Sequence, residues 1–332
     1  MKTTRKLTGA ALGLTTAFAL AACGGQQQQN QAGSGVDESS CEPGEGRLSI
    51  ATGNSTGVYY VVGGGLAKLI NDETDIQANA AETGASVQNI QQVVAGDYDI
   101  GFSLADTAAD AVNGDGDFDS GEDVATLGRI YSNYTHVVVQ KDSGIDSVED
   151  FAGKRISTGS PQSGTEVIAN RMIEAAGLSV DDVKAQRLDL TKTIDGMKDG
   201  SLDGFVWSGG LPTPGVTDLF TSKGKGVEFI DVTPLLPTMQ EVNEVYEETS
   251  IPGDTYGTST DIPTIAVPNV LMVRDDMPDN LACALTTTML QNKDRLVQVH
   301  PAAKELDPAL ATKTGPIPLH PGSERALDDL QD

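Results

Sequence analysis

A glycine-flanked serine is the first feature of this 332-residue sequence that could do chemistry. Residues 53–57, Gly-Asn-Ser-Thr-Gly, satisfy the G-x-S-x-G pattern of hydrolases with a serine nucleophile, and they lie between a predicted strand and a predicted helix. The pattern follows the first strand of the domain, however, whereas the hydrolase serine follows several strands that build the sheet beneath it. No sequence feature links Ser55 to His136, His300 or His320. A surface-anchored serine hydrolase is therefore kept only as an alternative.

The same turn can bind a ligand without catalysis. Small residues at a helix N-terminus let backbone N–H groups point at a carboxylate or phosphate, which the helix dipole also favours. A second turn of this kind, Gly-Ser-Pro-Gln-Ser-Gly-Thr, covers residues 159–165. Both turns follow strands, at the edge where open α/β sheets place their ligands. We therefore expect both turns to face one cleft.

Alternating strand and helix patterns position the first turn. An alternating stretch at 47–52 precedes it, and apolar residues at helical spacing follow it from Val58 to Ile70. Ser86 is expected to cap the next helix, which ends at Gly96 before a strand that starts at Asp99.

The same order of elements recurs about 105 residues later. A strand is expected near 154–158, followed by the second turn and a helix to Ala175. Three residues repeat at one spacing of 104, so that Ile90, Gly96 and Asp99 match Ile194, Gly200 and Asp203. Two tandem α/β lobes with doubly wound, largely parallel sheets are the simplest explanation.

Residues 1–22 have the features of a secretory signal peptide, with a basic start and an apolar run. They end in Leu-Ala-Ala before Cys23, a lipobox, so lipid is predicted on Cys23. Residues 23–46 are rich in Gln, Gly and Ser and are expected to form a disordered tether. The protein is therefore expected to be exported and lipid-anchored to the outer face of the cell membrane.

Two further cysteines, Cys41 and Cys283, leave two possibilities open. Disulfides persist in exported proteins, so the pair is expected either to form a bridge or to leave Cys283 free and buried and Cys41 unpaired.

Charge excludes one class of partner. Without the leader, 48 acidic residues face 19 basic ones, a net charge of −29, which argues against nucleic-acid binding.

Acidic residues alternate in the segment 113–119, but the Gly and Glu that a calcium loop needs at positions 6 and 12 are missing. No metal and no cofactor are expected.

Six motifs in order resemble the TAXI family, the solute receptors of one class of TRAP (tripartite ATP-independent periplasmic) transporters. They are residues 51–60 with Gly63 and Gly64, 83–89, 159–166, 208–212, 251–256 and 319–322. The resemblance implies a two-lobe type II periplasmic-binding-protein fold, with lobe 1 at 47–134, lobe 2 at 135–265 and a return segment at 266–332. This segment, with a strand at 264–273 and a helix at 280–297, is expected to pack mainly on lobe 1.

The resemblance further implies a receptor and not an enzyme. The receptor closes on a small organic acid or amino acid and passes it to ion-coupled integral-membrane subunits. The ligands expected first are C4 to C6 dicarboxylates and acidic amino acids such as glutamate. A receptor that passes its signal to a sensor instead of a transporter is a further alternative. The ligand-binding residues that it implies are Ser55, Thr56, Gly57, Tyr59, Thr83, Ser86, Asn89, Ser160, Ser163, Gly164, Thr165 and Gly210.

Several neighbouring positions stay open. Many relatives have Gln where this chain has Leu104, which removes a polar group near the cleft and leaves the ligand undetermined. Tyr59 could equally pack in the core, and core packing is expected for Trp207. The candidate carboxylate partners are Arg129, Arg155 and Arg171.

Overall fold

The computed structural model describes residues 40–331. The predicted signal peptide, the lipid site at Cys23 and most of the predicted tether lie outside the described residues.

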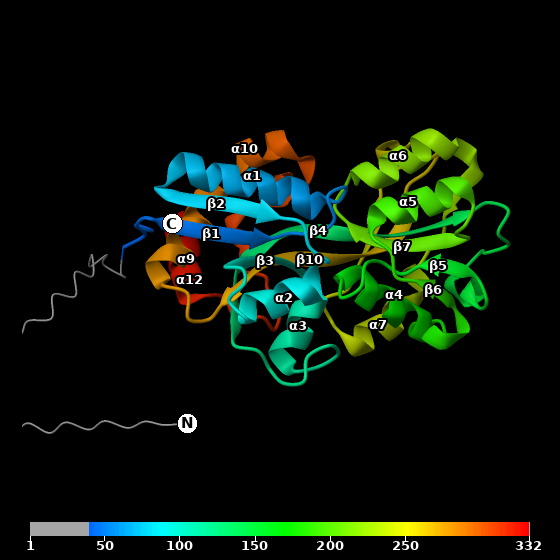
Figure 1. The fold of residues 1–332 in the computed structure, drawn as a ribbon, viewed down its shortest axis with the longest axis horizontal. Coiled ribbons are helices and arrows are strands. Elements are labelled where there is room, and N and C mark those ends of the chain that lie inside the picture. The colour runs from blue at the N-terminus through cyan, green and yellow to red at the C-terminus, as the bar shows by residue number, and fades with distance from the viewer. Residues whose placement is uncertain (1–39, 332) are drawn as a thin grey trace, which may run out of the picture. The chain divides into compact units, whose positions relative to one another are not determined.

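Within residues 40–331, ten strands form one sheet in the order β2-β1-β3-β10-β4-β7-β5-β6, with β8 added on β4 and β9 on β10 (Figure 1). The strand β1 is parallel to β2 and β3, and β5 is parallel to β6 and β7, whereas β4 and β10 run antiparallel to their neighbours. The strands are β1 Gly46–Ala51, β2 Ile76–Ala81, β3 Ile100–Leu104, β4 Val124–Gln140, β5 Arg155–Ser157, β6 Lys184–Gln186, β7 Gly204–Gly209, β8 Val227–Phe229, β9 Glu247–Ile251 and β10 Ile262–Arg274.

Helices cover both faces of this sheet (Figure 1). We call β1–β3 with α1–α3 and α9–α12 the first lobe, and β5–β9 with α4–α8 the second lobe. The helices are α1 Val58–Glu73, α2 Ser86–Val94, α3 Ala105–Asn113, α4 Gly164–Ala175, α5 Leu190–Asp199, α6 Pro214–Lys223, α7 Leu236–Val242, α8 Gly253–Tyr256, α9 Asp279–Gln291, α10 Lys293–Val299, α11 Pro308–Ala311 and α12 Pro321–Gln331.

Each lobe has an apolar core on either face of its part of the sheet. In the first lobe, α1 packs with α9 and α10 on one face, and α2 packs with α3 on the other. In the second lobe, α4 and α7 cover one face and α5 and α6 cover the other. The alternation of strands and helices therefore builds the doubly wound arrangement that the sequence predicts. The prediction of a largely parallel sheet was wrong, because β4 and β10 pair antiparallel with all their neighbours.

The strands β4 and β10 belong to both lobes. β4 pairs with β10 up to Tyr134 and with β7 from Tyr134 onward. The predicted lobe boundaries at 134/135 and 265/266 therefore fall inside the continuous strands β4 and β10. Because two long strands cross between the lobes, the lobes share one sheet instead of having a sheet each.

The 104-residue repeat has a structural cause. Asp99 precedes β3, and its carboxylate accepts a hydrogen bond from the Ser49 backbone N–H at 2.7 Å. Asp203 precedes β7 and accepts in the same way from the Arg155 N–H, also at 2.7 Å. Each aspartate thus fixes the start of one parallel strand against its neighbour.

The return segment departs from its prediction in one respect. The helix expected at 280–297 is broken at Asn292, which ends α9 and precedes α10. Leu285, Leu296 and Leu327 of this segment lie in the same core cluster as Ile50 of β1, so the segment packs on the first lobe.

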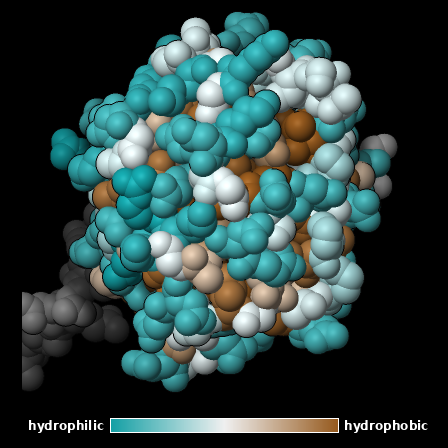
Figure 2. Space-filling view, turned by 90° about the vertical axis from the view of Figure 1, so that its right-hand side faces the viewer, coloured by the Kyte–Doolittle hydropathy of each residue, from teal (hydrophilic) through white to brown (hydrophobic). Residues whose placement is uncertain are grey.

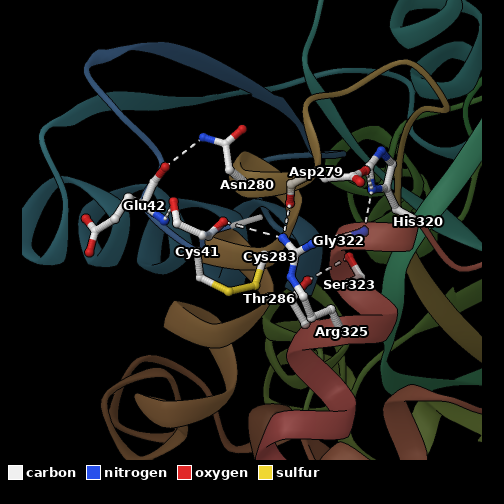
Figure 3. The surroundings of a disulfide bond; sticks show 11 residues. Cys41, Glu42, Asp279, Asn280, Cys283, Thr286, His320, Gly322, Ser323 and Arg325 are labelled. Atoms are coloured by element: carbon white, nitrogen blue, oxygen red, sulfur yellow. Dashed lines mark hydrogen bonds and ion pairs between the residues drawn. A yellow bond between two sulfur atoms is a disulfide. The ribbon is translucent and has the colours of Figure 1, made fainter. Parts of the chain in front are cut away.

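A disulfide joins Cys41 to Cys283 of α9 (Figure 3). This is one of the two possibilities that the sequence left open. Beside it, the Asn280 side chain donates to the Glu42 carbonyl at 2.6 Å. The chain before β1 is therefore held on α9 of the first lobe.

The face of the molecule on the side of the second lobe is mainly hydrophilic. Figure 2 shows this face, covered mostly by hydrophilic residues, with apolar residues scattered among them. Among the described helices, none is both long enough and apolar enough to span a membrane. No group of three or more His, Cys, Asp or Glu residues that could hold a metal ion occurs within residues 40–331.

Candidate functional site

A cavity lies between the lobes, where the two glycine-rich turns meet. Its lining residues are Gly53, Asn54, Gly57, Val58, Tyr59, Gly84, Ala85, Ser86, Leu104, Asn133, Ser163, Gly164, Thr165, Trp207, Ser208 and Gly209. The space open to the centre of a water-sized sphere is about 20 Å³, and one water needs about 10–15 Å³. This arrangement of the lobes is therefore a closed one, and the lobes must open to admit a ligand.

Three helix N-termini point to this cavity. The helices α1, α2 and α4 begin after Gly57, Ala85 and Ser163, and all three of these residues line the cavity. The first turns of α1 and α2 contain no acidic residue, and no side chain caps either helix. In α2 the Gln88 N–H already donates to the Gln162 carbonyl at 3.0 Å. The other N–H groups at these two helix starts and the positive ends of the helix dipoles favour a bound anion.

Ser86 does not cap α2 as predicted. The preceding residue, Ala85, has a positive φ of 84° and takes the N-cap position. Ser86 is therefore the first residue of the helix. The Ser86 hydroxyl instead accepts from the Leu104 N–H at 3.1 Å. Ser86 thus ties α2 to the end of β3 and still lines the cavity.

Half of the residues implied by the resemblance line the cavity, and half do not. The lining ones are Gly57, Tyr59, Ser86, Ser163, Gly164 and Thr165. The residues that the structure places outside the lining are Ser55, Thr56, Thr83, Asn89, Ser160 and Gly210. The second group surrounds the first, and two of its members support the turns.

Asn89 is buried, and its side chain is fully used by the protein. Its amide donates to the carbonyls of Thr52 at 2.7 Å and Phe102 at 2.8 Å, and its oxygen accepts from the Thr83 hydroxyl at 2.6 Å. Asn89 and Thr83 therefore position the turn after β1 instead of contacting a ligand.

Ser160 joins the lobes. The Asn54 side chain donates to its hydroxyl at 3.1 Å and accepts from the Leu190 N–H at 3.0 Å. Asn54 lies on the first turn, and both partners lie in the second lobe. This pair links the two lobes beside the cavity, a role that the motif alone could not show.

Tyr59 and Trp207 form aromatic walls. Burial raises the pKa of the Tyr59 phenol, which stays protonated and donates to the Asn269 side chain at 2.5 Å. As predicted, Trp207 packs against the core cluster of α5 and α6, and it also contributes to the cavity wall. Its ring lies against Gly57, where an added Cβ would be 3.2 Å from the indole.

The three candidate arginines are all engaged elsewhere. Arg129 donates to Ser132 at 3.1 Å, Arg155 pairs with Asp203, and Arg171 pairs with carboxylates of α3. None of the three lines the cavity, and no described lining residue has a charged side chain. A carboxylate bound here would be held by backbone N–H groups, hydroxyls and amides.

Ser55 lacks the environment of a nucleophile. It is exposed, outside the cavity, and its backbone N–H donates to Glu82 at 2.8 Å. The three histidines lie elsewhere, because His136 contacts Tyr256, His300 contacts the Pro212 carbonyl, and His320 accepts from the Gly322 N–H. No described histidine forms a hydrogen bond with Ser55, so the structure gives no support to the hydrolase alternative.

Comparison with known proteins shows the family. The profile of the NMT1-like family matches residues 50–329, most of the chain. The chain belongs to this family.

Solved structures resemble this NMT1-like protein in fold. One is a protein of Bordetella bronchiseptica RB50, 19% identical, with a TM-score of 0.53 over 85% of this chain and 88% of that one. Another is the alkanesulfonate-binding protein SsuA of Xanthomonas axonopodis pv. citri, 18% identical, with a TM-score of 0.47 over 85% of this chain and 83% of that one. The mixed α/β, two-lobe fold predicted from the sequence is therefore shared with the Bordetella protein.

A buried imidazole makes the stability of this NMT1-like protein depend on pH. Burial lowers the pKa of His136 from 6.5 to about 4. The unfolded chain therefore takes up this proton first, so the free energy of unfolding falls as the pH drops from about 6.5 toward 4, by about 3 kcal/mol for this group. Urea titrations across this range should show a weaker pH dependence for His136→Gln. Equal slopes in the variant and the wild type would contradict the prediction.

Proposed function

We propose that this protein is an extracytoplasmic solute receptor that binds a small carboxylate in the cavity between its lobes. The observation that carries the proposal is the convergence of three helix N-termini on a cavity without charged side chains. A protein with so negative a surface repels anions at long range, so an anion that binds needs closely aimed donors. Helix N-termini and hydroxyls supply such donors.

The six motifs extend the proposal to the transport system. Their resemblance to the TAXI family supports uptake through the ion-coupled membrane subunits of a TRAP transporter, with C4 to C6 dicarboxylates or acidic amino acids as ligands. Among the structures similar in fold, one is an alkanesulfonate-binding protein and another, from Streptococcus pneumoniae, was solved with bound histidine. A gene for a large multi-span protein beside this one would support a transporter over a sensor.

The direct test is to identify the ligand. Mass spectrometry of small molecules released by denaturing the purified protein should find a carboxylate. Calorimetry should then show binding of organic acids and no binding of neutral sugars, with an alkanesulfonate and histidine in the same panel. Binding of a sugar without binding of any carboxylate would overturn the proposal.

Ser163 is expected to contribute a hydroxyl to the ligand. Its oxygen accepts from the Glu166 N–H at 3.1 Å as the cap of α4, so its proton remains available for a carboxylate. Ser163→Ala should weaken binding roughly 10- to 150-fold in calorimetry. The lost cap should also lower the free energy of unfolding by about 1 kcal/mol. Unchanged affinity in the folded variant would contradict this role.

Lipid anchoring rests on Cys23 alone. Cys23→Ser should release the protein from the membrane fraction or block its processing, because the lipid is attached through this thiol. Fractionation followed by immunoblotting checks the result. Normal processing with full membrane retention would exclude the anchor.

A further inference from the structure

Ser208 of β7 has a buried hydroxyl that the protein does not use. The residue is 5% exposed, and its Oγ has no hydrogen-bond partner in the structure. An unpaired buried hydroxyl is costly, so native proteins seldom leave one without a role. Because Ser208 lines the cavity, its free hydroxyl points to a ligand.

Two polar neighbours hold Ser208 in place. Its backbone N–H donates to the Thr165 hydroxyl at 3.2 Å, and its carbonyl accepts from the Asn133 side chain at 3.1 Å. Thr165 and Asn133 are themselves buried and line the cavity. The Asn133 oxygen is taken by the Asn269 amide at 2.8 Å, so this corner offers hydrogen-bond donors to a ligand.

The same cavity offers little to an ammonium group. No described lining residue is a carboxylate, and the oxygens of both lining asparagines already accept hydrogen bonds from the protein. The three helix N-termini add positive potential, which repels a cation. The hydrogen-bond donors of the site thus suit the carboxylate of an amino acid, whereas the positive potential disfavours its ammonium group.

Building on the proposed function, we propose that Ser208, with Thr165 and Asn133, binds a carboxylate oxygen and that the site selects carboxylates without an ammonium group. Of the two ligand classes that the resemblance implies, the dicarboxylates fit this chemistry and the acidic amino acids do not. Ser208 is thereby assigned as a specificity-determining residue.

A variant at Ser208 separates this role from a structural one. Ser208→Ala removes a hydroxyl that has no protein partner, so the midpoint of urea unfolding should stay the same or rise. Affinity for the carboxylate should fall roughly 10- to 150-fold. Ser143→Ala is the matched control, because Ser143 has the same kind of unpartnered hydroxyl outside the cavity. This control should keep the wild-type affinity.

Matched ligand pairs test the selectivity. Succinate and aspartate, and likewise glutarate and glutamate, differ in one ammonium group. Calorimetry with the wild type should show binding of succinate or glutarate at least tenfold tighter than that of the corresponding amino acid. Equal or tighter binding of the amino acid would overturn the inference.

The outcomes also distinguish this inference from the proposed function. If the wild type binds no carboxylate in the whole panel, the proposed function fails, and this inference fails with it. If carboxylates bind and Ser208→Ala keeps the wild-type affinity, only the inference fails. Unchanged affinity together with lower stability of Ser208→Ala would show that the Ser208 hydroxyl forms a hydrogen bond with a buried water and not with the ligand.

Discussion

Replacing Arg171 with methionine is expected to destabilise the folded protein by about 3–5 kcal/mol, because the substitution leaves buried carboxylates without their cation. The Arg171 side chain is 13% exposed and donates to Asp106 at 3.2 Å and to Asp110 at 2.7 Å. Tyr246 also donates to Asp106, at 2.7 Å. Burial by itself acts to lower the pKa of Arg171, but these partners raise it above its usual range, so the guanidinium stays charged.

Urea unfolding at neutral pH measures this loss. Lys68→Met is the matched control, because the Lys68–Asp72 pair lies on an exposed helix face, where solvent screens the attraction and the pair should add little to stability. In Arg171→Met, acidification should recover part of the loss by neutralising the stranded carboxylates. A loss below about 1 kcal/mol in Arg171→Met would show that the cluster contributes little.

The second large effect concerns closure of the lobes over the ligand. An added Cβ at Gly164 would lie 2.6 Å from the Leu104 side chain and 2.6 Å from the Ser86 hydroxyl, both of the first lobe. Gly164→Ala should therefore hold the lobes apart and weaken binding roughly 5- to 150-fold, the range expected for one overpacked methyl group.

A second glycine provides the control. Gly64 lies in α1 with nothing within 4 Å of an added Cβ, so Gly64→Ala should keep the wild-type affinity and stabilise the helix by up to about 1 kcal/mol. Small-angle scattering of Gly164→Ala with saturating ligand should show a more open molecule than the wild type. Wild-type affinity and compactness in Gly164→Ala would refute the closure argument.

Local patterns in the sequence were sufficient to predict the strand, turn and helix that begin each lobe. Strand, turn and helix follow one another at 46–73 and again at 155–175, because alternation, small residues and helical spacing are short-range patterns. The apolar run at 264–273 predicts β10, but neither the length of β4 nor the sharing of both strands by the two lobes could be predicted in this way. Their buried runs do not alternate, and their partners lie far away in the sequence.

The site was predictable where backbone geometry determines it. Gly57, Ser163 and Gly164 line the cavity because helix starts need small or capping residues there. The resemblance to the TAXI family implies that Asn89 and Ser160 contact the ligand. Their hydrogen bonds go instead to carbonyls of β1 and β3 and to Asn54, and those partners appear only in the folded chain.

The disulfide determines which part of the receptor the membrane would hold. With lipid on Cys23, the first covalent attachment to the folded domain is Cys41, eighteen residues later, and not the start of β1. The full reach of these residues is then about 60 Å at most. This attachment point lies on α9 of the first lobe. The described part of the second lobe is linked to it covalently only through the shared sheet. With lipid on Cys23, the second lobe would move to admit a ligand while the disulfide keeps the first lobe within this reach of the bilayer.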